Sequence, residues 1–139
     1  MRKTILFPAL AAAIAAAALS GPATARPRLA PEAELASLLA GRTAGAPVDC
    51  IDPRVNSETR VIDHTAIVYG SGRTIYVQRP ANARSLDSDD ILVTRLTGSS
   101  QLCNVDVVHL HDRSGGWPRG FVMLERFVPY TRTGVAARD

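Results

Sequence analysis

Residues 65–78 of this chain read TAIVYGSGRTIYVQ. Two runs of apolar, aromatic and β-branched residues flank Gly70-Ser71-Gly72, and this arrangement predicts an antiparallel β-hairpin. Residues 65–69 and 73–78 are therefore expected to pair, with Tyr69 and Tyr76 as cross-strand neighbours.

Short β-rich runs separated by turn residues continue on both sides of this hairpin. Residues 79–90 are expected to form a long loop, and no repeat or alternation of strands with helices is present, so a parallel sheet is not expected. Further strands are predicted at residues 48–51, 59–63, 91–96, 102–111 and 120–125. The fold class predicted is mainly β, a small antiparallel curved sheet or partly open barrel of about six strands.

The first 25 residues have the organisation of a signal peptide. Arg2 and Lys3 precede an apolar run at residues 5–19, and Ala23-Thr24-Ala25 is a cleavage site of the small-x-small type. The run is shorter than the ~20 residues of a membrane span. We therefore expect a cleaved, periplasmic or secreted protein with no stable membrane insertion.

The rest of the chain is predicted to contain one domain. Residues 26–47 form a proline-rich lead-in, a short N-terminal helix at residues 31–40 and a linker. Residues 48–131 form a single β-rich domain, and residues 132–139 a flexible tail.

The charge of the mature chain is nearly balanced. Removing Arg2 and Lys3 reduces the 16 basic residues to 14 against 13 acidic ones, a net charge of +1. This balance disfavours a nucleic-acid partner, which needs a clustered basic excess. All remaining basic residues are arginines, so catalysis by lysine is excluded. We attribute the scattered arginines to genome composition rather than to anion recognition.

Cys50 and Cys103 are the two cysteines. An even cysteine count in a small exported domain predicts a disulfide, which contributes about 4 kcal/mol in the chain-entropy model. A reactive thiol pair or a metal site is the alternative, and no C-x-x-C spacing supports it.

Much of the β region resembles a family of small exported proteobacterial β-rich proteins without an established function. The resemblance implies export and a β-rich core but no activity. Members of that family often carry a second cysteine pair, and this chain has Phe121 in that neighbourhood and no further cysteine. The resemblance is carried by residues 50–51, 60–63, 65–67, 76–77, 100–106, 120–122 and 127–130, among which Leu102-Cys103-x-x-Asp106 is the most distinctive.

His109 and His111 are the candidate metal ligands. Residues two apart on a strand face the same side, so both imidazoles could bind one metal ion. Asp106 and Asp112 fall on the opposite face, which leaves His64 as the third histidine available. The alternative is a solvent-facing pair.

Two acidic motifs give weaker hypotheses. Residues 87–90 read DSDD and could bind calcium, although they lack the spacing of an EF-hand loop and are typical of a solvated turn. Asp63 and His64 could in principle belong to a catalytic triad. Adjacent residues on a strand point to opposite faces, however, and no G-x-S-x-G motif is present. No catalytic residue and no cofactor is predicted.

Trp117 lies in a Gly/Pro-rich loop between Arg113 and Arg119. Tryptophan and arginine are enriched at interface hot spots, so these three residues are the candidate partner-binding residues. The alternative for Trp117 is a ring folded back over the barrel end. Phe121, Phe127 and Tyr130 are expected in the core.

The leading hypothesis is a non-enzymatic exported β-domain that binds a periplasmic or extracellular partner protein, for example as an inhibitor of an exported hydrolase. The alternative is a metal or small-ligand binding protein that uses His109 and His111. The oligomeric state is left open.

Overall fold

The structure is a computed structural model that describes residues 27–96 and 98–134. The predicted signal peptide at residues 1–25 lies outside the described residues, as do residues 135–139 of the predicted tail. No helix in the described ranges has the length and apolar character needed to cross a membrane.

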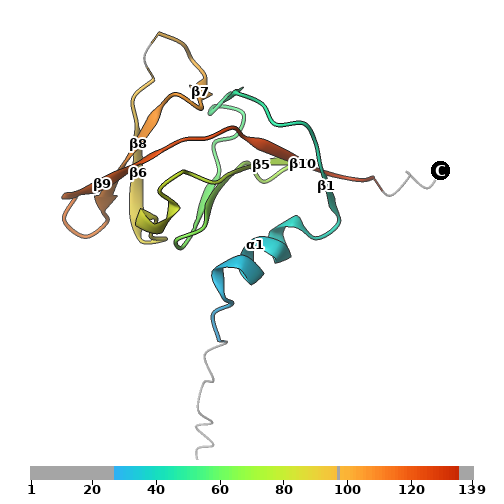
Figure 1. The fold of residues 1–139 in the computed structure, drawn as a ribbon, viewed down its shortest axis with the longest axis horizontal. Helices are drawn as coiled ribbons and strands as arrows, with labels where there is room; N and C mark the ends of the chain where they lie inside the picture. Colours follow the sequence, from blue (N-terminus) through green and yellow to red (C-terminus); the bar gives the residue numbers. More distant parts are fainter. Residues whose placement is uncertain (1–26, 97, 135–139) are drawn as a thin grey trace, which may run out of the picture.

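The protein is mainly β, as the sequence predicts (Figure 1). The predicted count of about six strands is wrong: the described residues form ten short strands, which belong to three antiparallel sheets, none of them closed. The helices are α1 (Pro31–Leu39) and the 3-10 helix η1 (Ala83–Ser85). The strands are β1 (Arg42–Ala44), β2 (Cys50–Ile51), β3 (Thr59–Ile62), β4 (Ala66–Tyr69), β5 (Thr74–Gln78), β6 (Asp90–Thr94), β7 (Leu102–Cys103), β8 (Val107–Asp112), β9 (Pro118–Met123) and β10 (Val128–Arg132).

The predicted hairpin lies inside a five-stranded sheet of order β1-β10-β5-β4-β3. Tyr69 pairs with Tyr76 across β4 and β5, as predicted. β1 falls in the segment predicted as a linker, and β10 extends into residues predicted as tail. Thr43 pairs with Thr131, so both segments gain their backbone partners from a contact between the two ends of the domain.

The helix α1 covers one face of this sheet, as Figure 1 shows. It begins with Pro31 in its first turn and ends at Leu39, one residue before the predicted end, ahead of Gly41 with a φ of +71°. Leu35 is 1% exposed and packs among side chains that point from the sheet toward the helix: Ile62, Ala66, Val68, Ile75 and Val77.

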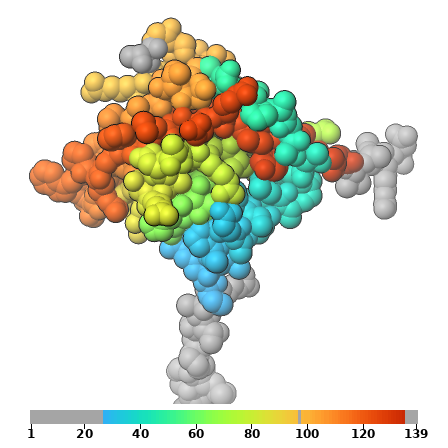
Figure 2. Space-filling model, viewed as in Figure 1, coloured from blue at the N-terminus to red at the C-terminus, as the bar shows by residue number. Residues whose placement is uncertain are grey.

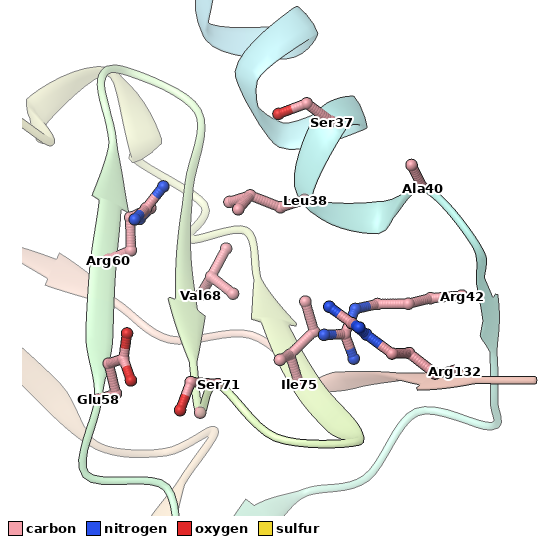
Figure 3. A pocket seen from close by; sticks show the side chains of 11 residues that line it. Ser37, Leu38, Ala40, Arg42, Glu58, Arg60, Val68, Ser71, Ile75 and Arg132 are labelled. Carbon is pink, nitrogen blue, oxygen red and sulfur yellow. The ribbon is translucent and has the colours of Figure 1, made fainter. Parts of the chain in front are cut away.

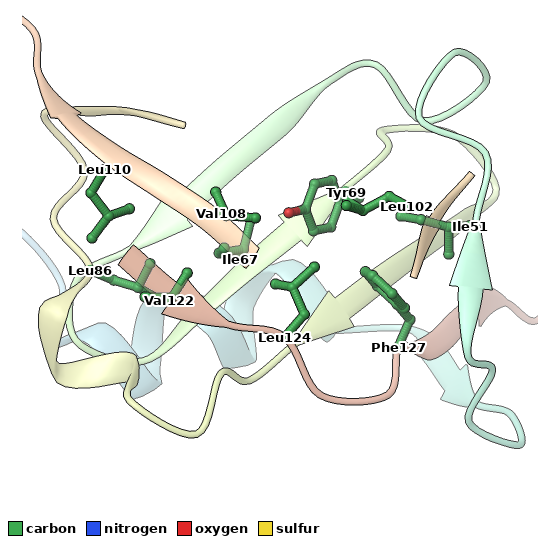
Figure 4. Close-up of a cluster of buried hydrophobic side chains, with 10 residues drawn as sticks. All are labelled: Ile51, Ile67, Tyr69, Leu86, Leu102, Val108, Leu110, Val122, Leu124 and Phe127. Carbon is green, nitrogen blue, oxygen red and sulfur yellow. The ribbon is translucent and has the colours of Figure 1, made fainter. Parts of the chain in front are cut away.

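The opposite face of the sheet packs on the three-stranded sheet β6-β8-β9, and the core lies between them (Figure 4). Ile67 and Tyr69 of β4 point into this core, whereas Ala66 and Val68 face the helix. Both faces of β4 are therefore covered, which explains its uninterrupted apolar run. The domain has three layers: α1, the five-stranded sheet and β6-β8-β9.

The long strand predicted at residues 102–111 is wrong. The carboxylate of Asp106 accepts a hydrogen bond from the backbone N–H of Cys103 at 2.7 Å and closes a turn that divides the segment into β7 and β8. β7 pairs only with β2, and the predicted disulfide between Cys50 and Cys103 joins these two strands.

Candidate functional site

The outer face of β6-β8-β9 points away from the core. In β8, Val108 and Leu110 are buried and face inward, so His109 and His111 face outward by alternation. Two rows of cross-strand neighbours each include one of these histidines, and one further cross-strand pair lies on the same face. The rows are Val93–His109–Phe121 and Ile91–His111–Pro118, and the pair is Val107–Met123. We call these eight residues the outer face.

The outer face is apolar and exposed. Phe121 is 50% exposed, Met123 49%, and Ile91 and Val93 40% each. None of its eight residues carries an aspartate, glutamate, lysine or arginine side chain. Contiguous apolar patches on a folded domain mark interaction sites, because single exposed apolar residues are common but clustered ones are not. Phe121, predicted to lie in the core, belongs to this patch instead.

The edge of this sheet at β9 is covered by Asn82. Its side-chain amide donates to the carbonyl of Phe121 at 2.8 Å, and its carbonyl oxygen accepts from the N–H of Met123 at 3.0 Å. The amide thus takes the place of a neighbouring strand and satisfies the free backbone groups. Asn82 therefore hinders strand addition at this part of the β9 edge, whereas the outer face is open for contacts.

The β8–β9 loop carries Trp117 beside the outer face, on a hairpin that projects from the molecule (Figure 2). The carboxylate of Asp112 accepts hydrogen bonds from the backbone N–H groups of Ser114 and Gly115 at 2.9 and 2.8 Å. The hydroxyl of Ser114 also donates to this carboxylate, and it lowers the pKa of Asp112 most, with the two backbone N–H groups adding to the effect. The loop is therefore held in a defined conformation.

Trp117 is 74% exposed, and its ring lies against the next turn of its own loop. A Cβ atom at Gly115 would lie 2.6 Å from its indole Nε1, so any other residue there would require the Trp117 ring to shift. Gly116, with a φ of +69°, supplies the left-handed conformation that the tight turn needs. The Trp117 side chain is thus both positioned and accessible.

The two predicted partner-binding arginines are occupied by contacts within the domain. Arg119 donates to the carboxylate of Asp90 at 2.9 Å and lies 3.6 Å from that of Asp87. Arg113 donates to the backbone carbonyls of Asp89 and Asp90 at 3.2 and 3.4 Å. Both arginines therefore attach the β8–β9 hairpin to the acidic segment.

Asp90 is the buried centre of that contact. Its side chain is 1% exposed, and its Oδ2 has no hydrogen-bond partner. Burial raises the pKa of Asp90, opposed by the charge and the hydrogen bond of Arg119 and reinforced by the nearby charges of Asp87 and Asp112. The segment predicted as a calcium loop thus binds an arginine of its own domain.

The histidines do not converge on one point. The Nδ1 atom of His111 lies 3.0 Å from the carbonyl oxygen of Gly116, and that of His64 lies 2.7 Å from the carbonyl oxygen of Arg84 in η1. In the described part of the chain, no group of three or more histidine, cysteine or carboxylate side chains could hold a metal ion. His109 and His111 share the outer face without a third ligand among the residues that the structure describes.

Asp63 and His64 bind different partners. Asp63 accepts a hydrogen bond from the backbone N–H of Ser88 at 2.6 Å, whereas the His64 ring is bonded to Arg84. Although burial raises the pKa of Asp63, the Ser88 hydrogen bonds and the Arg28 charge outweigh it, and the net pKa is lowered. Both residues connect the β3–β4 turn to the loop that follows β5.

Sequence reasoning missed the apolar members of the outer face. Ile91-Leu92-Val93 is apolar at every position, which is the sequence signal of a strand with two apolar faces. Phe121 and Met123 alternate with buried Val122 and Leu124 in the same way. Comparison with protein-family models, curated proteins and solved structures found no match.

Proposed function

We propose that this protein is a non-enzymatic binding domain whose outer face docks a partner protein with an apolar, uncharged contact surface. The observation that carries this proposal is the uncovered apolar face of β6-β8-β9. Burying apolar area supplies about 25 cal/mol per Å² before the costs of association, so exposed apolar side chains in contiguous rows favour docking.

The partner's chemistry follows from the charge of the face. No side chain of the outer face offers a carboxylate or guanidinium, and His109 and His111 are its only polar side chains, so a highly charged partner surface would lose most of its hydration without compensation. A flat row of strand residues also matches a protein surface better than a small ligand. Trp117 extends the contact beyond the sheet as an aromatic anchor. The expected setting is the periplasm or the exterior of the cell.

The polar contacts support binding rather than catalysis. The side chains of Asp63, His64 and Asp112 are each hydrogen-bonded to backbone groups of neighbouring turns, where they stabilise loops. The apolar side chains of the outer face, by contrast, are left exposed in the described structure.

Matched affinity capture tests this proposal. The tagged protein and its Phe121→Arg and Val93→Arg variants are mixed with native periplasmic extract and cross-linked mildly. Val55→Arg is the control, because Val55 is 79% exposed and lies in the turn between β2 and β3. We expect one protein to be captured by the wild type and by Val55→Arg and lost with both face variants.

Three results would contradict the proposal. Capture that is equal for all four proteins would place the contact elsewhere, and no capture at all would remove the partner. Concentration-dependent dimerisation that Phe121→Arg abolishes would assign the face to a second copy of this chain.

One observation favours metal binding as a second candidate function. A hydrogen bond from His111 Nδ1–H to the Gly116 carbonyl would orient the ring and leave Nε2 free as a ligand, the usual arrangement around metal-bound histidine. A Zn²⁺ ion held by His109 and His111 would take its remaining ligands from water or from the partner. Calorimetric titration with Zn²⁺ should show saturable binding that the His109→Ala, His111→Ala double variant loses and His64→Ala keeps. Unchanged binding in the double variant would exclude these ligands.

A further inference from the structure

A pocket of about 240 Å³ lies between the C-terminal end of α1 and the five-stranded sheet (Figure 3). It is on the helix side of that sheet and is therefore separate from the outer face. Charged and apolar residues line it. The charged ones are Arg42, Arg60, Arg132 and Glu58, and the apolar ones include Leu38, Val68 and Ile75. Figure 3 shows Arg42 and Arg132 side by side and Arg60 across the pocket from them.

Among the described residues, no ion pair neutralises the arginines of this pocket. None of its three arginines forms an ion pair in the described part of the chain, whose salt bridges involve Arg28, Arg79, Arg119 and Arg126. Glu58 and the carbonyl end of α1 offset part of the charge. Burial, with a contribution from the charge of Arg132, lowers the pKa of Arg42. The remaining excess suits a singly charged anion.

Arg42 is held in place by backbone carbonyls, and among the described residues its Nε–H and one N–H of NH2 are left without an acceptor. Its NH1 donates to the carbonyl of Arg73 at 2.7 Å, and both NH1 and NH2 donate to the carbonyl of Gly72 at 3.1 Å. Its Nε is buried without a hydrogen-bond partner. A ligand acceptor cannot reach the enclosed Nε, but it can accept from the remaining N–H of NH2. The Arg132 guanidinium beside it is exposed and can bind a carboxylate through two parallel hydrogen bonds.

We propose that this pocket binds a small monocarboxylate with a compact apolar body, whose carboxylate contacts Arg132 and Arg42 and whose apolar part lies on Leu38, Val68 and Ile75. The volume is slightly below the roughly 300–1,000 Å³ of sites for drug-sized ligands, which limits the body to a few carbon atoms. Such a group occurs in a free short-chain carboxylic acid and in the C-terminal apolar residue of a peptide. This site is independent of the docking proposed for the outer face.

Titration calorimetry with defined probes tests the site and distinguishes the two sources. Hexanoate represents the free acid, and a pentapeptide ending in leucine represents the peptide terminus. The same peptide with a C-terminal amide keeps the apolar part and removes the charge, and inorganic phosphate tests for unspecific anion binding. We expect saturable binding of at least one carboxylate probe and at least tenfold weaker binding of the amide and of phosphate.

Arg132→Gln is the informative variant, because no hydrogen bond or ion pair of its side chain holds the described fold, whereas Arg42 binds backbone carbonyls that an Arg42 variant would release. Arg132→Gln should weaken the binding of the carboxylate probe at least tenfold. Arg95→Gln, at an exposed position, should leave this affinity unchanged. Binding of hexanoate alone would identify a free acid, and binding of the acid peptide alone a peptide terminus. The absence of saturable binding, equal affinity for amide or phosphate, or an unchanged affinity in Arg132→Gln would each overturn the proposal.

Discussion

Arg119 and Asp90 show how a single contact can decide what a residue does. Arg119 resembles a hot-spot arginine in sequence, next to tryptophan and proline, but its guanidinium neutralises a carboxylate that is almost completely buried. A charge of this kind is costly to leave without a partner. Arg119 therefore stabilises the base of the β8–β9 hairpin, and Trp117 is the accessible member of the predicted trio.

Replacing Arg119 should consequently destabilise the fold. Arg119→Ala is expected to lower the free energy of unfolding by about 1.5–3 kcal/mol, the range for hydrogen bonds to charged groups, and exposed Arg95→Ala should change it by less than about 0.5 kcal/mol. Urea titration measures both values. An equal effect of the two substitutions would contradict the structural role of Arg119.

The pH dependence of this loss has a definite sign. Burial raises the pKa of Asp90 in the folded state above its unfolded value, and removing Arg119 raises it further. The contribution of Asp90 to the stability of the variant is then fully present below the unfolded pKa of about 3.9. It is lost as the pH rises through the folded pKa. The deficit of Arg119→Ala should be larger at pH 7 than at pH 4. A deficit that grows toward acid would show that Asp90 is not the group involved.

At the scale of elements, the sheet β6-β8-β9 has one face that packs in the core and one face that is exposed. Leu110 is 1% exposed and packs in the core, whereas its neighbour His109 points outward. Leu110→Ala should cost about 3 kcal/mol because it leaves a cavity, and His109→Ala should cost less than about 0.5 kcal/mol. Denaturant unfolding of the two variants tests the alternation. Comparable losses would mean that the outer face is covered.

The elements defined by local chemistry were predictable. Gly70-Ser71-Gly72 identified the β4–β5 hairpin, and Pro31 with Gly41 identified α1, because turn and cap signals act over a few residues. The division of residues 102–111 was missed, since the turn depends on one Asp106 hydrogen bond within a β-branched segment. β1 was missed because its partner, β10, is distant in sequence.

The sites required the topology as well. The exposure of Phe121 depends on which side of β9 is covered by another layer, and the sequence around Phe121 does not indicate which side that is. Arg42, Arg60 and Arg132 are scattered in sequence and were attributed to composition. The pairing of β1 with β10 brings Arg42 opposite Arg132, and β3 adds Arg60 from the other side of the pocket. Such a cluster cannot be recognised before the strand order is known.

On the scale of the whole molecule, the disulfide joins the two strands of the smallest sheet, which are distant in sequence. β2 and β7 have two residues each, and the bridge closes a loop with a sequence separation of 53. Its loss should destabilise the domain by about 4 kcal/mol, which corresponds to a Tm decrease of roughly 15 °C for a domain of this size. Thermal unfolding with and without reductant, and of the Cys50→Ser, Cys103→Ser variant, measures this. A decrease below about 3 °C would contradict the estimate.

The three layers together leave the outer face of β6-β8-β9 uncovered, and this is the basis of the proposed function. Site-specific photo-cross-linking in living cells tests it most directly, with the cross-linking amino acid placed at position 121 and, as a control, at position 55. We predict a single protein adduct at position 121 that is absent at position 55. No adduct at position 121, or the same adduct at both positions, would contradict docking through the outer face.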